Sequence, residues 1–178
     1  MLPILLALSF IVLLLVVIIA GRPSEFTITR STKVTAPPDK VFPLVNDFHQ
    51  WNAWSPWAKM DPDCRNTFEG APAGTGAGFA WSGNKKVGEG RMTILESRPS
   101  DFIRIKLEFV RPFKATNVAE FTFKPEGGQT LVIWSMSGKN NFMFKAVGMF
   151  MDCEKMVGGD FEKGLAGIKS LAETAAAR

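Results

Sequence analysis

An uncharged apolar run from Leu2 to Ala20, interrupted only by Pro3 and Ser9, constrains the fold of this 178-residue chain more than any other feature. An α-helix rises about 1.5 Å per residue, so a helix over this run is roughly 28 Å long, close to the hydrocarbon thickness of a bilayer. No side of the run is polar, which argues against a helix packed on a soluble core. We therefore expect residues 1–21 to form a single transmembrane anchor and residues 22–178 to form a separate domain.

The competing interpretation of this run is a cleaved signal peptide. No Lys or Arg precedes the run, and it is longer than the apolar region of about 7–15 residues that signal peptides carry. Cleavage after Ala20 or Gly21 would also place an isoleucine where a small residue is needed. These three features favour the uncleaved anchor.

Charged side chains predict an orientation and exclude several functions. Arg22, Arg30 and Lys33 follow the apolar run and no basic residue precedes it, so the positive-inside rule predicts a single-pass membrane protein with a cytoplasmic domain.

A net charge of +4 with a pI of 9.2 is too small a bias to indicate nucleic-acid binding. One histidine and two cysteines form neither a zinc cluster without a carboxylate nor a disulfide scaffold. We expect no metal and no cofactor.

Beyond Ser24 the hydrophobic pattern predicts an alternation of strands and helices. Period-two patterns and β-branched residues predict strands at 25–35, 66–70, 78–82, 88–97, 102–109, 115–124 and 130–137. A short helix is expected from Pro38, a turn or second short helix over 48–57, and helical character over 142–151. A long amphipathic helix then extends to about Ala175, and the Gly158–Gly159 pair within it predicts a kink or close packing. One long helix against seven antiparallel strands is an α+β fold, and a helix across a curved sheet leaves a cavity beside it.

Two local stretches carry a resemblance to a known superfamily. Residues 34–42 (VTAPPDKVF) and 48–57 (FHQWNAWSPW, followed by Asp61-Pro62) are similar to the first-strand exit and the tryptophan-rich stretch of bacterial START-like (SRPBCC) proteins. This superfamily includes the polyketide cyclase/dehydrase and lipid transport proteins, and the resemblance covers about residues 24–174.

What the resemblance implies is the helix-grip fold. In this fold a curved seven-stranded antiparallel sheet surrounds the long C-terminal helix, two short helices follow the first strand, and a hydrophobic ligand cavity lies between sheet and helix. The resemblance does not imply one reaction, because the fold serves binders, carriers, cyclases and chaperone regulators.

Three tryptophans at every third position, Trp51, Trp54 and Trp57, would lie along one side of a helix, although Pro56 argues against one unbroken helix. They form either the wall of a cavity for an apolar ligand or a packed corner between the short helices and the sheet, and we favour the packed corner. The candidate ligand-cavity residues are aromatic and apolar side chains expected to face inward: Trp51, Trp54, Trp57, Trp81, Phe109, Phe121, Trp134, Met143, Val147 and Met151.

Polar candidates for catalysis or phosphate binding are weaker. His49 is the only histidine, and Asp47 lies close enough in sequence to orient it as a general acid or base. No nucleophile motif accompanies it, so we assign no catalytic residue and expect a surface or helix-capping histidine. The glycine-rich run from Gly74 to Gly78 leads into a strand instead of a helix, which argues against a phosphate-binding loop.

Basic side chains gather on or after one predicted strand, at Arg104, Lys106, Arg111 and Lys114. They form either a face for anionic lipids or a solvated outer sheet face diluted by Glu108, and we favour the solvated face.

Three functions remain open from the sequence. The first is membrane-tethered binding of a hydrophobic small molecule or lipid in the cavity. The second is a polyketide cyclase-like enzyme, which would need His49 or a cavity carboxylate such as Glu69, Glu96 or Glu120 with a raised pKa. The third is a protein-interaction or stress-accessory module with a collapsed cavity and an exposed apolar patch. The expected partners are thus an apolar ligand and the membrane, with no nucleic acid.

Overall fold

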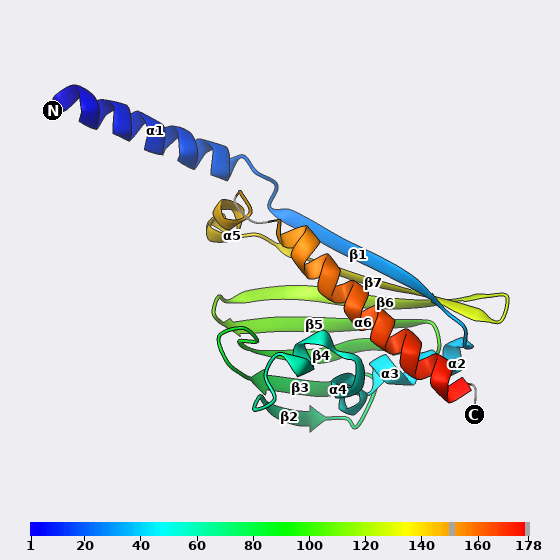
Figure 1. Ribbon diagram of the computed structural model, residues 1–178. Coiled ribbons are helices and arrows are strands. Elements are labelled where there is room, and N and C mark those ends of the chain that lie inside the picture. The colour runs from blue at the N-terminus through cyan, green and yellow to red at the C-terminus, as the bar shows by residue number, and fades with distance from the viewer. Residues whose placement is uncertain (150–151, 177–178) are drawn as a thin grey trace.

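The structure, a computed structural model, describes residues 1–149 and 152–176. Its strands form one antiparallel sheet in the order β1-β7-β6-β5-β4-β3-β2, so β1 and β2 are the two edges (Figure 1). Their bounds are β1 (Glu25–Val34), β2 (Arg65–Gly70), β3 (Ala77–Ser82), β4 (Glu89–Arg98), β5 (Phe102–Arg111), β6 (Ala115–Glu126) and β7 (Gln129–Lys139). Each predicted strand is confirmed to within a few residues at its ends.

Helices precede, interrupt and follow the sheet. The long ones are α1 (Leu2–Ala20) and α6 (Cys153–Ala176), and α5 (Phe142–Val147) lies between β7 and α6. The short segments between β1 and β2 are α2 (Pro38–Val41), α3 (Pro43–Asn46), η1 (Phe48–Gln50), α4 (Trp51–Trp54) and η2 (Pro56–Lys59). Proline begins three of these five segments, because its fixed φ suits the first turn of a helix. The α+β helix-grip fold is therefore confirmed, with the two predicted short helices divided into smaller turns.

The sheet has one buried face, which α6 covers (Figure 1). On β5, Ile103 and Ile105 are fully buried, whereas Arg104 between them is partly exposed. On the neighbouring strands, Phe121 of β6 lies opposite Trp134 of β7, and both are buried. The core thus lies between the inner face of the sheet, the short helices and α6.

Glycines allow α6 to approach the core closely. A Cβ added at Gly164 would lie 2.8 Å from Cζ3 of Trp134, and one added at Gly167 would lie 2.9 Å from the backbone oxygen of Trp54. The helix runs unbroken through Gly158, where an added Cβ would overlap the guanidinium group of Arg30. Close packing is therefore confirmed at Gly158, whereas a Cβ added at Gly159 would meet nothing within 4 Å.

Helix α1 contributes nothing to this core. None of its residues is buried, and the buried hydrophobic residues of the described chain all lie between Ile28 and Ala172. By length and composition α1 is apolar enough to cross a membrane, a test that a signal sequence also passes. The Nζ atom of Lys145 on α5 donates a hydrogen bond to the carbonyl oxygen of Ala20 at 3.2 Å, so α5 lies beside the end of α1.

Candidate ligand-binding site

An aromatic cluster fills the interior beneath the middle of α6, from Phe161 toward its C-terminal half. The ring of Trp134 stacks 3.9 Å from Phe161 and 4.7 Å from Phe121, measured between ring centroids, and Trp54 meets it edge-on at 5.7 Å. Trp51 stands beside Trp54 at 4.6 Å. All five side chains are at most 5% exposed, so this half of the interior is solid.

Backbone oxygens of the short helices hold two of these indoles in place. The Nε1–H of Trp51 donates to the carbonyl of Val45 at 2.9 Å, and that of Trp54 donates to the carbonyl of Leu44 at 2.8 Å. Trp51 and Trp54 of the tryptophan repeat therefore build a packed corner where the short helices meet the sheet, whereas the buried Nε1–H of Trp134 has no hydrogen-bond partner among the described residues.

The other two candidate tryptophans are half-buried at the margins of the cluster. Trp57 packs edge-on against Trp134 with a centroid separation of 6.0 Å. Trp81 packs edge-on against Phe109 at 5.9 Å and donates to the carbonyl of Val87 at 3.3 Å.

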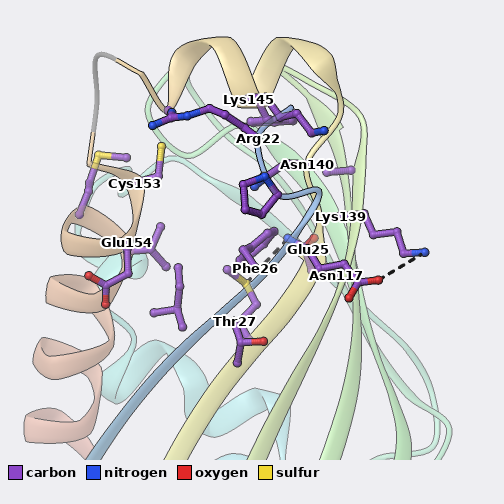
Figure 2. Close-up of a pocket in the computed structure, with 18 of the residues that line it drawn as sticks. Arg22, Glu25, Phe26, Thr27, Asn117, Lys139, Asn140, Lys145, Cys153 and Glu154 are labelled. Carbon is purple, nitrogen blue, oxygen red and sulfur yellow. Dashed lines mark hydrogen bonds and ion pairs between the residues drawn. The ribbon is translucent and has the colours of Figure 1, made fainter. Parts of the chain in front are cut away.

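A pocket of about 800 Å³ occupies the other half of the interior, under the N-terminal half of α6 (Figure 2). Its walls come from the start of β1, the hairpin between β5 and β6, the end of β7, α5 and the first turns of α6. The lining is mainly apolar: Phe26, Ile28, Phe109, Phe113, Met136, Phe144, Met149, Met156 and Val157 are among the side chains that form it. The predicted cavity between sheet and C-terminal helix is thus present near the α1 end of the domain.

One of the ten candidate cavity residues, Phe109, lines this pocket. Met143 and Val147 lie on α5, where Met143 is exposed and Val147 half-buried. Met151 lies outside the described residues. The others belong to the aromatic cluster or its margins, as described above. Asn117 is a lining residue that the sequence analysis missed. Its signal in the sequence is a polar residue in phase with buried Ala119 on β6.

Ionisable side chains line the rim of the pocket next to α1. Arg22 follows the end of α1 by two residues, and Lys145 contacts that end directly. Glu25 and Lys139 stand 3.8 Å apart and are about four-fifths exposed (Figure 2). The mouth therefore begins where the apolar helix stops.

Residues 25–173 match the protein family described as polyketide cyclase/dehydrase and lipid transport. The chain belongs to this family. No curated protein shows a significant match to the chain.

Solved structures share the fold of this family member at low sequence identity. Protein MLL2253 from Mesorhizobium loti is 17% identical, with a TM-score of 0.62 over 84% of this chain and 98% of that one. The Aha1 dimer from Colwellia psychrerythraea is 12% identical, with a TM-score of 0.59 over 83% and 96%. StfQ, a di-domain ARO/CYC protein of the steffimycin biosynthetic pathway, is 12% identical, with a TM-score of 0.65 over 87% of this chain and 53% of StfQ.

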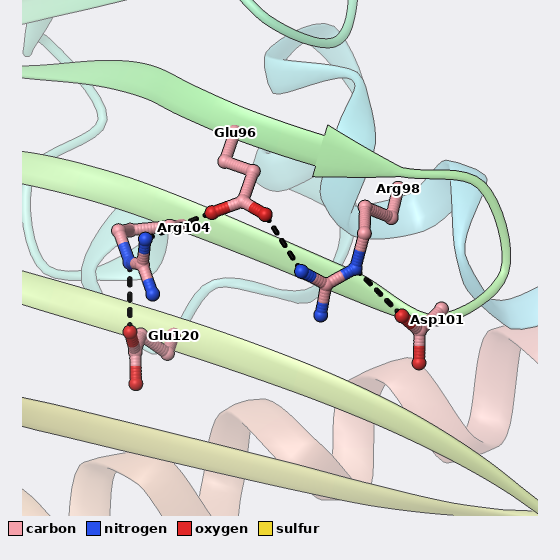
Figure 3. Close-up of polar contacts among 5 residues, drawn as sticks. All are labelled: Glu96, Arg98, Asp101, Arg104 and Glu120. Carbon is pink, nitrogen blue, oxygen red and sulfur yellow. Dashed lines mark hydrogen bonds and ion pairs between the residues drawn. The ribbon is translucent and has the colours of Figure 1, made fainter.

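Two of the carboxylates considered for a cyclase-like reaction, Glu96 and Glu120, lie on the outer face of the sheet of this family member (Figure 3). Glu96 accepts hydrogen bonds from Arg98 at 2.7 Å and Arg104 at 2.8 Å, and Glu120 accepts one from Arg104 at 2.9 Å. Glu69 pairs with Arg91 at 3.0 Å. None of these three carboxylates is among the residues that line the pocket.

Ion pairs also involve the basic side chains on and after β5. Arg104 pairs with two glutamates, Lys106 lies 2.6 Å from Glu108, and Arg111 pairs with Glu89. Opposite charges thus offset three of the four basic side chains, all but Lys114 in the described part of the chain, which fits a solvated outer face.

His49 is a surface histidine at the other end of the interior. Its Nδ1 atom lies 2.8 Å from Oδ1 of Asp47, whose carboxylate also accepts a hydrogen bond from the backbone N–H of His49 and caps η1. The imidazole stacks on Phe68 with a centroid distance of 4.0 Å. The side chain is half-exposed and lies outside the pocket lining.

Proposed function

We propose that this protein is a membrane-tethered binder of a hydrophobic small molecule or lipid. The pocket carries this proposal, because about 800 Å³ with a mainly apolar lining lies within the range of roughly 300–1,000 Å³ that small-molecule sites occupy. Helix α1 is proposed as the single-pass anchor, and the positive-inside rule assigns the domain to the cytoplasmic side.

The place of the mouth supports a membrane-resident ligand. Arg22 and Pro23 line the pocket and directly follow α1, so an anchored domain holds its mouth near the headgroups. A tether also raises the effective concentration of a site relative to ligands in the same bilayer. The ligand then moves from lipid to pocket with little exposure to water.

The energetics agree with this route. Transfer of one CH₂ group from water to an apolar site gains about 0.8 kcal/mol, so a twelve-carbon chain left in water would gain roughly 10 kcal/mol in the pocket. Lipid tails are as apolar as the side chains of the pocket, so a chain that starts in the bilayer gains little from burial alone. The polar groups along the pocket therefore decide which membrane molecule is selected.

The enzymatic alternative has less support. A cyclase-like reaction needs an ionisable group facing the substrate, and Glu69, Glu96 and Glu120 face the outer side of the sheet. The carboxylates that do line the pocket, Glu25, Asp152 and Glu154, are exposed to water. The interaction-module alternative requires a collapsed cavity, whereas the cavity in this chain is open.

Native mass spectrometry of residues 22–178 purified from a bacterial host, followed by lipid extraction, tests the proposal. This part contains the whole described core, because α1 buries no residue. A lipid or isoprenoid retained near one per protein is expected. A protein that retains nothing and also ignores an added panel of lipids and aromatic polyketides would refute the proposal.

A matched pair of variants shows whether the ligand occupies this pocket. Val157→Trp places an indole in the pocket from α6 and is expected to expel the ligand. Ala166→Trp adds the same side chain at an exposed position of α6 and is expected to leave binding unchanged. Equal ligand retention by both variants would place the ligand elsewhere.

A further inference from the structure

Asn117 is a buried polar side chain on the inner face of β6, where its neighbours in phase, Ala119 and Phe121, are apolar. The domain buries two other polar side chains in its described residues, Ser55 and Thr130. The hydroxyl of Thr130 donates a hydrogen bond to the carbonyl of Ala36 at 2.7 Å, which satisfies it. Asn117 differs because it lines the pocket and is only 7% exposed.

The amide of Asn117 is poorly satisfied by the protein. Its Nδ2 atom donates to the sulfur of Met136 at 3.8 Å, and a thioether is a weak acceptor. Within residues 1–149 and 152–176 this is the one hydrogen bond that the side chain makes. A carboxamide has two N–H donors and an oxygen with two lone pairs, so most of its capacity remains for a molecule in the pocket.

A glycine on the neighbouring strand β7 leaves room for the side-chain amide of Asn117. Gly138 of β7 is the cross-strand partner of both Asn117 and Phe26. A Cβ at position 138 would overlap Oδ1 of Asn117 and lie 3.0 Å from Cε1 of Phe26. Glycine therefore lets the amide and the phenyl ring lie over the inner surface of the sheet, where Figure 2 shows them near one another.

The charged residues of the lining are mostly exposed to water, unlike Asn117. Half-buried Lys145 donates to the carbonyl of Ala20. The exposed ones are Arg22, Glu25, Lys139, Asp152 and Glu154. A charged headgroup beside Asn117 would lose its hydration without gaining a counter-ion, whereas an uncharged hydroxyl or carbonyl needs only the hydrogen bonds that an amide offers.

We infer that Asn117 determines specificity by binding the hydroxyl or carbonyl group of an uncharged amphiphile, whose chain lies against Phe26, Ile28 and Met136. This inference rests on the proposed function and names the ligand class of that site. It also supplies the discrimination that apolar burial lacks, because a bilayer offers the same apolar surroundings to every chain but no amide at this depth.

The test uses the full chain in lipid nanodiscs and two photo-crosslinking probes, a diazirine-bearing hexadecanol and the matching diazirine-bearing hexadecane. Both probes are present at the same mole fraction of the bilayer, so labelling of pocket peptides compares their affinities from a common starting state. In the wild-type protein we expect the alcohol to label the pocket about tenfold more than the alkane, the factor that one well-placed hydrogen bond provides.

Variants then assign this preference to the amide. Asn117→Leu is expected to reduce labelling by the alcohol about tenfold and leave labelling by the alkane unchanged. Asn117→Val is a smaller apolar variant for the case in which leucine prevents folding. Asn66→Leu is the matched control, because it makes the same replacement at an exposed position of β2 outside the pocket lining, and it should retain the preference.

The outcomes separate the two proposals. Equal labelling by both probes in the wild-type protein, or a preference for the alcohol that persists in Asn117→Leu or Asn117→Val, would overturn the role of Asn117 while ligand binding stands. Labelling of the pocket by neither probe would overturn the proposed function, and the inference about Asn117 with it.

Discussion

Replacing Gly164 by alanine is expected to destabilise the domain, although alanine is the better helix former. A Cβ at this position would lie 2.8 Å from Cζ3 of Trp134 and 3.4 Å from Cζ3 of Trp54. The ring of Trp134 has no room to retreat, because it is stacked between Phe121 and Phe161. Overpacking of this kind costs about 1–3 kcal/mol, and the gain in helix propensity offsets about 1 kcal/mol of it. The net loss is about 0–2 kcal/mol.

Gly159 provides the control on the same helix. A Cβ at this position has nothing within 4 Å, so Gly159→Ala gains helix propensity without a collision. It should stabilise the domain by about 1 kcal/mol. The two glycine-to-alanine variants should therefore move in opposite directions and differ by about 1–3 kcal/mol.

Urea unfolding of residues 22–178, followed by tryptophan fluorescence, measures this difference, and thermal melting followed by circular dichroism provides a second readout. For a domain of this size, 1 kcal/mol corresponds to about 2–4 °C in Tm. If Gly164→Ala is stabilised as much as Gly159→Ala, then α6 does not press against Trp134, and the description of a solid half of the interior is wrong.

Three further predictions follow from other contacts. Trp54→Ala should lower the free energy of unfolding by about 3–5 kcal/mol, because Trp54 is 3% exposed; a loss below 1 kcal/mol in urea unfolding would contradict its place in the core. A hydrogen bond from the backbone N–H of Thr35 lowers the pKa of Glu173 in the folded state, so this carboxylate adds stability above its ordinary pKa of 4.5, and the contribution is lost as the pH falls from 4.5 through the lowered pKa. Urea midpoints measured against pH should therefore depend less on pH below 4.5 in Glu173→Gln than in the wild type, and parallel curves would count against the contact. Burial raises the pKa of the Cys64 thiol, so in a Cys153→Ser variant at pH 8 iodoacetamide should alkylate Cys64 more slowly in the folded than in the urea-unfolded chain, and equal rates would disprove this.

The strands were predictable from sequence because burial on one face leaves a local signal. On β5, Ile103 and Ile105 alternate with Arg104, and that alternation requires only that one face of the sheet be dry. The division of the short helical segment was harder to predict. Proline begins a new helical segment at Pro43 and again at Pro56, so these divisions depend on the prolines and not on the period of the tryptophans.

The position of the pocket was not predictable from local pattern. It depends on the distance between α6 and the sheet, which the contact of Gly164 with Trp134 sets between residues far apart in sequence. The tryptophan repeat attracted attention because indoles line many ligand sites, yet Trp51 and Trp54 find carbonyl partners inside the core. The local signal near the pocket was weaker: one asparagine, Asn117, in a row of buried apolar positions.

The interior is solid under one half of α6 and hollow under the other, and this division separates two demands on the sequence. Fold stability rests on the stacked rings around Trp134, whereas the shape of the hollow also rests on side chains outside the core cluster, such as Phe113, Phe144 and Met149. Exchange of the second group alters what fits inside without disturbing the first. A fold arranged in this way tolerates drift in its choice of ligand at little risk of unfolding, and that tolerance offers a physical reason why one architecture is reused for many different molecules.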